Sequence, residues 1–339
     1  MKFKLKGFRL LILLVFSSVA LKAQQSKQWI TYQPNKGPGN GKYIVFVSGD
    51  EEYRSEESLP LLAKILAKED GFKTTVLFAI NPKTAKVDPN YEQNIPGLEH
   101  LEQADLMVIF TRFRELPDSQ MKYINEYIQA GKPVVGMRTA THAFRYQRNL
   151  NSPYAKYSFD SKVDGWFNGF GRRVFGETWI SHHGVNHEEG TRGLINGALD
   201  LKNLAILRGV HDIFVQSGTY TSRQDLGGDA KILVWGQPTN GMTPESKINV
   251  DKSAMPVAWI RNYTSDEGNT GRAFATTMGT AVDLKNEGFR KLMVNACYWA
   301  LGMESQITDQ NDAKIIGEFE PTNFGDDKFK KDLEPSDFK

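Results

Sequence analysis

The chain of 339 residues has only one cysteine, Cys297. A single thiol excludes an intrachain disulfide and any CxxC metal site. Stability must therefore come from buried apolar side chains, and about 300 residues are enough to enclose one large core. Cys297 lies beside a stripe of apolar residues at helical spacing between Phe289 and Ala300, so we expect it to pack in the core rather than to act as a nucleophile.

Long hydrophobic runs are scarce as well, and the one candidate lies near the N-terminus. Leu10 to Phe16 follow four basic residues, and Leu21-Lys22-Ala23 ends on the small residue that a signal peptidase prefers. This pattern predicts a signal peptide over residues 1–23 and an exported protein, periplasmic or extracellular. A lone transmembrane anchor is the alternative, but the run is short for a span of about 20 residues and no second run follows. We therefore expect no stable membrane anchor.

Charge of one sign is not in excess. The chain has 42 basic and 40 acidic residues, and residues 1–23 contain five basic residues and no acidic one. Without that segment, 37 basic and 40 acidic residues give a formal charge of −3. This balance does not suit binding to nucleic acid or to an anionic membrane. The oligomeric state is not indicated by the sequence.

Apolar runs that alternate with helical patterns dominate the rest of the chain. Strands are predicted over residues 43–48, 74–78, 106–110 and 133–137, with helices over about 55–69 and 119–130 between them. Ser55 or Ser58 is expected to cap the first of these helices. Continuous apolar strands that alternate with helices indicate βαβ units around a parallel sheet covered on both faces. Weaker patterns predict strands over 232–235, 257–260 and 272–276 and a helix over about 289–300.

The two ends of the chain differ from this pattern. Residues 24–41 are polar and rich in proline and glycine, which predicts a leader without regular structure. Residues 42–303 are expected to form one domain. Residues 304–339 form a polar, charged tail that is expected to lie on the surface or to be disordered.

Acidic residues crowd the end of the first predicted strand, where a parallel sheet builds its ligand site. Five carboxylates fall between Asp50 and Glu57. We expect Asp50, Glu52 and Tyr53 to belong to the site, because they precede the helix. For Glu56 and Glu57 a solvated, helix-capping role is an equal alternative.

Two arginines follow the third predicted strand. Arg112 and Arg114 alternate with aromatic residues, so one can point into the cleft and the other to solvent. The planar fork of an arginine suits carboxylates and sugar hydroxyls. A surface ion pair is the alternative interpretation.

The turn after the fourth predicted strand reads GMRTATH, and turns at this place can display a nucleophile. Gly136 would let the chain turn without a Cβ, and Arg138 lies at or just after the apex. The turn has no cysteine or serine, so its candidate site residues are Arg138, Thr139 and His142. For His142 a purely structural role is an equal alternative.

Three of the six histidines lie in FGETWISHHGVNHEEG, at His182, His183 and His187. Two nearby glycines favour a loop over a helix. A zinc site that also uses Glu188 is the weaker interpretation, because HHxxxH without HExxH is a weak metal signal. We expect neither a metal nor another cofactor. As donors to a polyhydroxylated ligand, with Trp179 as a stacking surface, the histidines need no metal.

Five stretches in order resemble the ThuA-like (trehalose utilisation) family of the class I glutamine amidotransferase-like superfamily: GDEEYRSEESLPLLAKIL, VVGMRTATHAF, FGETWISHHG, PVAWIRNY and FRKLMVNACYWALG. The similarity covers residues from about 42 to 302. It implies a flavodoxin-like, doubly wound, mainly parallel sheet in three α/β/α layers. In the amidotransferases this turn carries a nucleophilic cysteine, but here Met137 and Arg138 stand in its place. We therefore do not expect glutamine hydrolysis by that route.

The resemblance and the side chains both indicate a carbohydrate ligand. ThuA-like proteins are associated with disaccharide pathways that pass through 3-keto sugars, whose carbonyl acidifies the adjacent C–H. Arg138 could stabilise an oxyanion or enolate, His142 or His183 could move a proton, and Glu52 or Asp50 could act as a base or orient a histidine. The expected substrate-binding residues are Asp50, Tyr53, Arg112, Thr139, Trp179 and His182. We therefore expect an exported enzyme of the isomerase, lyase or hydrolase type that acts on trehalose, another disaccharide or a 3-keto derivative.

Two alternatives stay open. The first is a non-catalytic carbohydrate-binding protein that kept the scaffold without the nucleophile and uses Tyr53, Trp166 and Trp179 to stack on sugar rings. The second is a zinc hydrolase built on the histidine loop. Turnover abolished by Arg138→Ala would exclude the first, and the second predicts stoichiometric metal in the purified protein.

Overall fold

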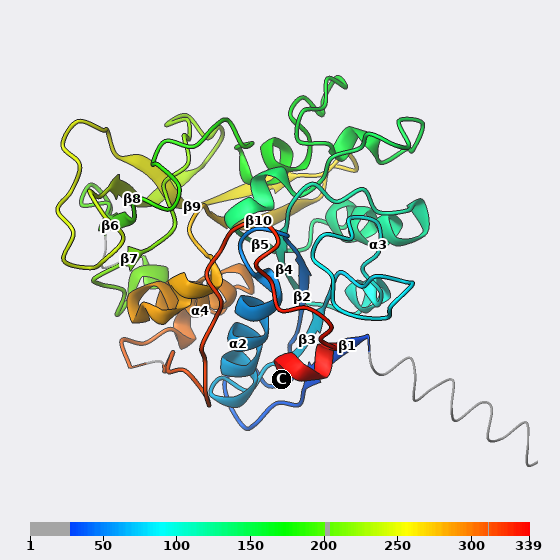
Figure 1. The fold of residues 1–339 in the computed structure, drawn as a ribbon, viewed down its shortest axis with the longest axis horizontal. Coiled ribbons are helices and arrows are strands. Elements are labelled where there is room, and N and C mark those ends of the chain that lie inside the picture. The colour runs from blue at the N-terminus through cyan, green and yellow to red at the C-terminus, as the bar shows by residue number, and fades with distance from the viewer. Residues whose placement is uncertain (1–27, 201–203, 311) are drawn as a thin grey trace, which may run out of the picture.

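A computed structural model describes residues 28–200, 204–310 and 312–339 of the chain (Figure 1). The predicted signal peptide, residues 1–23, lies outside these ranges. Within them, no helix combines the length and the apolar character that a membrane crossing requires.

One sheet runs through the described part of the molecule, with the strand order β1-β3-β2-β4-β5-β10-β9-β8-β6-β7. Its strands are β1 (Trp29–Tyr32), β2 (Tyr43–Gly49), β3 (Lys73–Leu77), β4 (Leu106–Thr111), β5 (Val134–Met137), β6 (Thr191–Ile195), β7 (Phe214–Val215), β8 (Lys231–Pro238), β9 (Met255–Thr264) and β10 (Thr270–Thr276). Strands β3, β2, β4, β5 and β10 are parallel, whereas β1 and the strands from β9 to β7 pair antiparallel. The sheet is therefore mixed, and the prediction of a mainly parallel sheet holds only for its five central strands.

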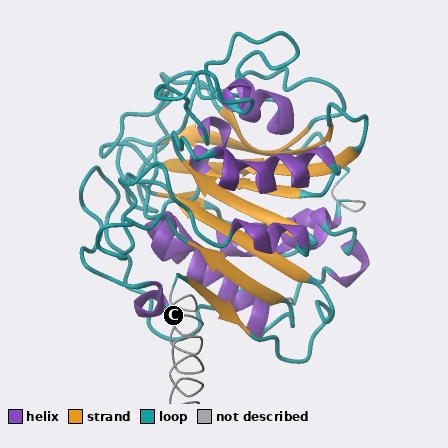
Figure 2. Ribbon diagram, turned by 90° about the vertical axis from the view of Figure 1, so that its right-hand side faces the viewer, coloured by secondary structure: helices purple, strands orange, loops and turns teal. Residues whose placement is uncertain are grey.

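Helices cover both faces of the sheet (Figure 2). Helices α2 (Ser55–Lys68) and α4 (Glu287–Ala300) share one core cluster with Ile44 and Phe46 of β2. Helix α3 (Asp118–Gln129) shares the other cluster with Val45 and Val47 of the same strand. Because successive strand residues point to opposite faces, burial on both sides requires the continuous apolar runs seen in the sequence.

Short helical turns complete the fold. They are η1 (Leu98–Glu102), η2 (Arg138–His142), η3 (Ala155–Tyr157), η4 (Gly171–Phe175), η5 (Ala205–Leu207), η6 (Ala281–Lys285), η7 (Glu304–Gln306) and η8 (Pro335–Phe338). Of these, η2 and η4 lie beside the carboxyl end of β5, where η4 forms a single π-helical turn.

Three sequence expectations about local structure are wrong. Residues 29–32, within the supposed leader, form edge strand β1 against β3. Helix α2 begins after Arg54, whose φ is 63°, without a side-chain cap; Ser55 instead accepts a hydrogen bond from the backbone N–H of Asp50 at 3.0 Å. Gly136 lies within β5 rather than in the turn, and an added Cβ would lie 2.5 Å from the Phe175 ring. Glycine is thus needed there for close packing.

The described part of the C-terminal tail, residues 304–310 and 312–339, packs on the domain (Figure 1). It runs beside α2 towards the carboxyl ends of the central strands and then returns towards β1 and β3, where Phe338 stacks on Phe78 with ring centroids 5.7 Å apart. Cys297 of α4 is fully buried, and this burial raises the pKa of its thiol, which is consistent with a packing role.

Candidate functional site

The carboxyl ends of the parallel strands form the candidate site. After β2 the chain adds β3 on one side and then continues to β4 on the other side of β2, so the strand order reverses between β2 and β4. Open α/β sheets bind ligands at such a switch point. The loops after β2, β4 and β5 meet here, and each contains predicted site residues.

Asp50 joins two of these loops. Its buried carboxylate accepts the backbone N–H groups of Glu52 at 2.8 Å and Tyr53 at 2.6 Å through Oδ1. Its Oδ2 accepts the hydroxyl of Thr139 at 2.5 Å, across from the turn after β5. Both carboxylate oxygens therefore accept hydrogen bonds within the protein. Through these contacts Asp50 and Thr139 position the loops after β2 and β5 relative to each other.

Arg138 is the central cation of the site. Its φ of 45° lies in the left-handed region, which a non-glycine residue adopts only when the surrounding structure enforces it. The buried guanidinium lies 4.4 Å from the ring centroid of Tyr53 and 3.9 Å from that of Tyr220. Nη1 donates to the carbonyls of Gly218 at 2.9 Å and Thr277 at 2.5 Å.

The other donors of Arg138 are unused. Its Nε and Nη2 are buried and make no hydrogen bond of normal geometry among the described residues, although the Tyr53 hydroxyl lies near enough to raise the pKa of Arg138. The hydroxyl of Tyr53 also makes no hydrogen bond of normal geometry, although burial raises its pKa and the nearby Arg138 opposes that shift. Buried donors without partners are rare in folded proteins, so this cluster is a candidate for contact with a ligand.

Arg112 and Arg114 form an ion-pair network with the loop after β2. Glu51 bridges the two arginines, with 2.6 Å to Nη1 of Arg112 and 2.6 Å to Nη2 of Arg114. Arg114 is fully buried and donates to the carbonyls of Arg112 and Pro89. The Arg112 side chain is 21% exposed but is held by Glu51, so neither arginine points freely into solvent. Burial raises the pKa of the Glu51 carboxyl, and the two guanidinium groups oppose this effect.

Glu52 connects this network to the histidine loop. Its carboxylate lies 3.2 Å from Nη2 of Arg112 and accepts the Asn186 side-chain amide at 3.0 Å. With only 7% of its surface exposed, Glu52 is a buried carboxylate held at the edge of the site.

Two histidines border Arg138 through Tyr220. His142 is buried, with ring centroids 5.9 Å from Tyr220 and 5.6 Å from Trp179. His182 stacks on Tyr220 at 5.3 Å and 19°. Burial, together with the nearby arginines, lowers the pKa of His142 well below its usual value and that of His182 to about 4. Both rings are therefore neutral at pH 7.

The other two histidines of the loop lie apart. His183 donates from Nε2 to the carbonyl of Ser253 at 2.8 Å, and His187 stacks on Phe324 at 4.6 Å. The structure brings together Arg138, His142 and His182 but does not bring His183 to them. In the described ranges, no three His, Cys, Asp or Glu side chains are grouped to hold a metal ion, so the geometry does not support the zinc interpretation.

Sequence reasoning missed several members of the site. Tyr220 lies in a segment with a weak pattern, and nothing in the sequence marks it as a neighbour of Arg138. Glu51 belongs to the acidic loop, but nothing in the sequence distinguishes it from its neighbours as the residue that bridges Arg112 and Arg114. Phe324 of the tail packs 5.7 Å from the Tyr53 ring, and Asp326 lies 3.9 Å from Arg112. These contacts join segments that are far apart in the chain.

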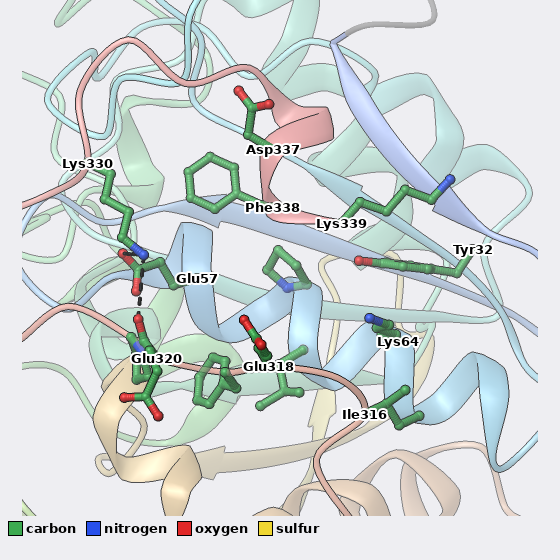
Figure 3. Close-up of a pocket in the computed structure, with 14 residues that line it drawn as sticks. Tyr32, Glu57, Lys64, Ile316, Glu318, Glu320, Lys330, Asp337, Phe338 and Lys339 are labelled. Carbon is green, nitrogen blue, oxygen red and sulfur yellow. Dashed lines mark hydrogen bonds and ion pairs between the residues drawn. The ribbon is translucent and has the colours of Figure 1, made fainter.

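A pocket of about 180 Å³ between α2 and the tail is not part of this site (Figure 3). Two of its charged side chains pair with each other, Lys330 lying 3.8 Å from Glu57, and Glu57 also accepts two hydrogen bonds from Thr322 at 2.7 Å. We therefore locate the candidate site at the carboxyl edge of the sheet.

Comparison with known proteins identifies the family. Residues 42–300 match the sequence model of ThuA, described as trehalose utilisation. Comparison with curated proteins gives no match.

Three solved structures are similar to the chain at low identity. A ThuA-like protein from Parabacteroides merdae is 15% identical, with a TM-score of 0.47, and the alignment covers 77% of this chain and 90% of that one. The mmIFT52 N-terminal domain is 10% identical, with a TM-score of 0.39 and coverage of 76% and 97%. The exo-beta-1,4-mannosidase Op5Man5 from Opitutaceae bacterium strain TAV5 is 10% identical, with a TM-score of 0.34 and coverage of 78% and 36%. On the match over residues 42–300, the chain belongs to the ThuA family.

Proposed function

We propose that the chain binds an oxygen-rich carbohydrate, a disaccharide or its 3-keto derivative, at the carboxyl edge of the sheet and transfers a proton on it without a cysteine nucleophile. Membership of a family described by trehalose utilisation supports a carbohydrate-related role. The observation that carries the mechanism is the buried Arg138 guanidinium, which has two unused donors beside two neutral histidines.

In this mechanism Arg138 binds the carbonyl oxygen of the sugar. A base removes the proton from the adjacent carbon, the electron pair moves into the carbonyl, and the resulting enolate oxygen is stabilised by Nε and Nη2 of Arg138. A preorganised cation in a buried site stabilises such a charge far better than water does. Protonation at the same carbon completes exchange, and protonation at the former carbonyl carbon completes isomerisation. In elimination the enolate is not protonated; its electron pair expels the oxygen substituent of the β-carbon, which leaves as an alcohol after taking a proton.

The proton carriers in this proposal are His182, His142 and Glu52. His182 has both the contact with Tyr220 and access to solvent, so it is the first candidate for exchange of the proton. The Glu52 carboxylate is of a type that can accept a proton. It pairs with Arg112 and accepts a hydrogen bond from Asn186, which favours a positioning role. His183 already donates a hydrogen bond to the carbonyl of Ser253, so it is a weaker candidate for proton transfer than His182 or His142.

We also infer export and a flavodoxin-like core. The basic and apolar pattern of residues 1–23 supports export to the periplasm or the exterior. The parallel strands, in the order β3-β2-β4-β5-β10 with helices on both faces, follow the doubly wound order 2-1-3-4-5.

The test is a proton NMR time course in deuterated water with trehalose and with a 3-keto disaccharide. We expect deuterium to enter beside the keto group, and Arg138→Lys and Arg138→Ala to slow exchange by about 100-fold or more. Arg272→Ala is the matched control, because Arg272 lies in β10 at the opposite end from the site. Exchange that is equal in all four proteins would refute the mechanism.

A non-catalytic carbohydrate-binding protein is the second candidate. The aromatic rings of Trp179, Tyr220 and Phe159 around His142 favour it, because such rings stack on sugar faces. In the same experiment this function predicts broadened sugar lines without deuterium exchange and without a product.

A further inference from the structure

A second pocket lies where η4 packs against strand β9 of the sheet. Its volume is about 340 Å³, and its wall includes Phe167, Leu226 and three arginines, Arg172 and Arg173 of η4 and Arg261 of β9. Among the described residues that line it, none is acidic. Three guanidinium groups therefore surround one pocket. Because like charges repel, this arrangement does not by itself stabilise the fold.

The three arginines are only partly neutralised. Arg173 pairs with Asp266 at 3.2 Å, but Lys156 also pairs with that carboxylate, at 2.9 Å. Asp229, the acidic neighbour of Arg261, already accepts hydrogen bonds from the backbone and side chain of Asn262. The local carboxylates therefore have other partners.

Several donors at the pocket are unused. Arg261 donates from Nε to the carbonyl of Asn262 at 3.1 Å, and its two Nη groups have no hydrogen bond within the described part of the chain. The Nε of Arg173 is buried without a partner. Burial lowers the pKa of Arg261 and the charge of Asp229 opposes this effect, whereas Arg172 and Arg173 lower the pKa further, as expected for neighbouring cations.

Contacts between η4 and β9 fix the chain segments that carry these arginines. The indole of Trp259 on β9 donates to the carbonyl of Phe175 at 2.7 Å and so fixes η4 on the strand. Gly176, with φ of 82°, leaves the space that Arg261 occupies, because an added Cβ would lie 2.5 Å from Nη1 of Arg261. The pocket is therefore preorganised, which reduces the entropic cost of binding.

We propose that Arg172, Arg173 and Arg261 form a binding site for the phosphate or carboxylate group of a small anionic ligand. Guanidinium groups bind both oxyanions through paired, charge-assisted hydrogen bonds. Phe167 and Leu226 provide an apolar wall for the rest of the ligand. None of the residues that line this pocket belongs to the candidate site at the carboxyl edge, and the inference does not depend on the proposed carbohydrate chemistry.

The test is isothermal titration of the purified protein with inorganic phosphate and, separately, with citrate, at ionic strength held constant with sodium chloride. We expect saturable binding of at least one of them, and Arg261→Gln should weaken it by about tenfold or more, since a charge-assisted contact is lost. Preference for phosphate or for citrate distinguishes the two ligand groups.

The controls separate this site from general charge effects. Arg172→Gln provides a second variant if Arg261→Gln folds poorly, and Arg272→Gln removes a cation elsewhere in the sheet. Binding lost with Arg172→Gln and kept with Arg272→Gln supports the site. Absence of saturable binding of both anions, or equal affinity in all the variants, overturns it.

Discussion

At the scale of single residues, the site is organised by charges that have no access to bulk water. Arg138 keeps its charge between two tyrosine rings, and Asp50 has both oxygens engaged by the loops that it joins. The buried His142 and the more exposed His182 both lie near arginines, and their lowered pKa values keep both rings neutral. This neutrality has a measurable consequence for stability.

We predict that His182 stays neutral in the folded protein down to about pH 4. Its pKa in the folded state is lowered to about 4, whereas an unfolded histidine titrates near about 6.5. Between these values the unfolded chain binds more protons, so the free energy of unfolding falls as the pH falls through this window. NMR titration of the ring protons tests the pKa directly.

The matched variant for this prediction is His182→Gln. Urea unfolding between pH 7 and pH 4 should show a weaker pH dependence in the variant than in the wild type. The ring is partly open to solvent, so the difference is smaller than for a fully buried group. A ring that titrates near pH 6.5 in the folded protein would contradict the prediction.

At the scale of elements, the end of β5 depends on a glycine that contacts an aromatic ring. We predict that Gly136→Ala destabilises the protein by about 1–3 kcal/mol, because the new Cβ would lie 2.5 Å from the Phe175 ring and force a shift of β5 or η4. The control is Gly197→Ala, where the added Cβ meets nothing within 4 Å.

Urea unfolding at pH 7 measures this difference. Gly197→Ala should change the free energy of unfolding by less than about 0.5 kcal/mol. Equal effects of the two substitutions would show that Phe175 does not restrict β5. Because β5 leads directly into Arg138, a shift here should also reduce any turnover that depends on Arg138.

The elements that the sequence predicts well are those whose own residues show whether they are buried. Strands β2, β4 and β5 are buried on both faces, so their apolar runs predict them nearly to the residue. Strands β1, β6 and β7 are short, and β1 and β6 are only partly buried, so no periodic signal distinguishes them. In the site, the strand ends locate Asp50, Arg112 and Arg138. Tyr220 could not be predicted, because its position depends on contacts between distant segments.

At the scale of the whole molecule, the C-terminal tail closes one side of the candidate site. Phe324 is 2% exposed and lies between Tyr53 and His187. The backbone N–H of Gly325 donates to the carbonyl of Glu52 at 2.7 Å. The family match ends at residue 300, so this part of the site lies outside the matched region.

We predict that Phe324→Ala lowers the free energy of unfolding by about 3–5 kcal/mol, the cost of removing a buried aromatic ring. The loss also leaves Tyr53 without its neighbour on the side of the tail, so binding of a sugar beside Arg138 should weaken. Lys328→Ala, a change at an exposed position of the same tail, is the control and should alter neither property. Urea unfolding and sugar titration on the same samples separate the two effects: reduced stability with unchanged sugar binding would mean that the tail supports the fold but is not part of the site.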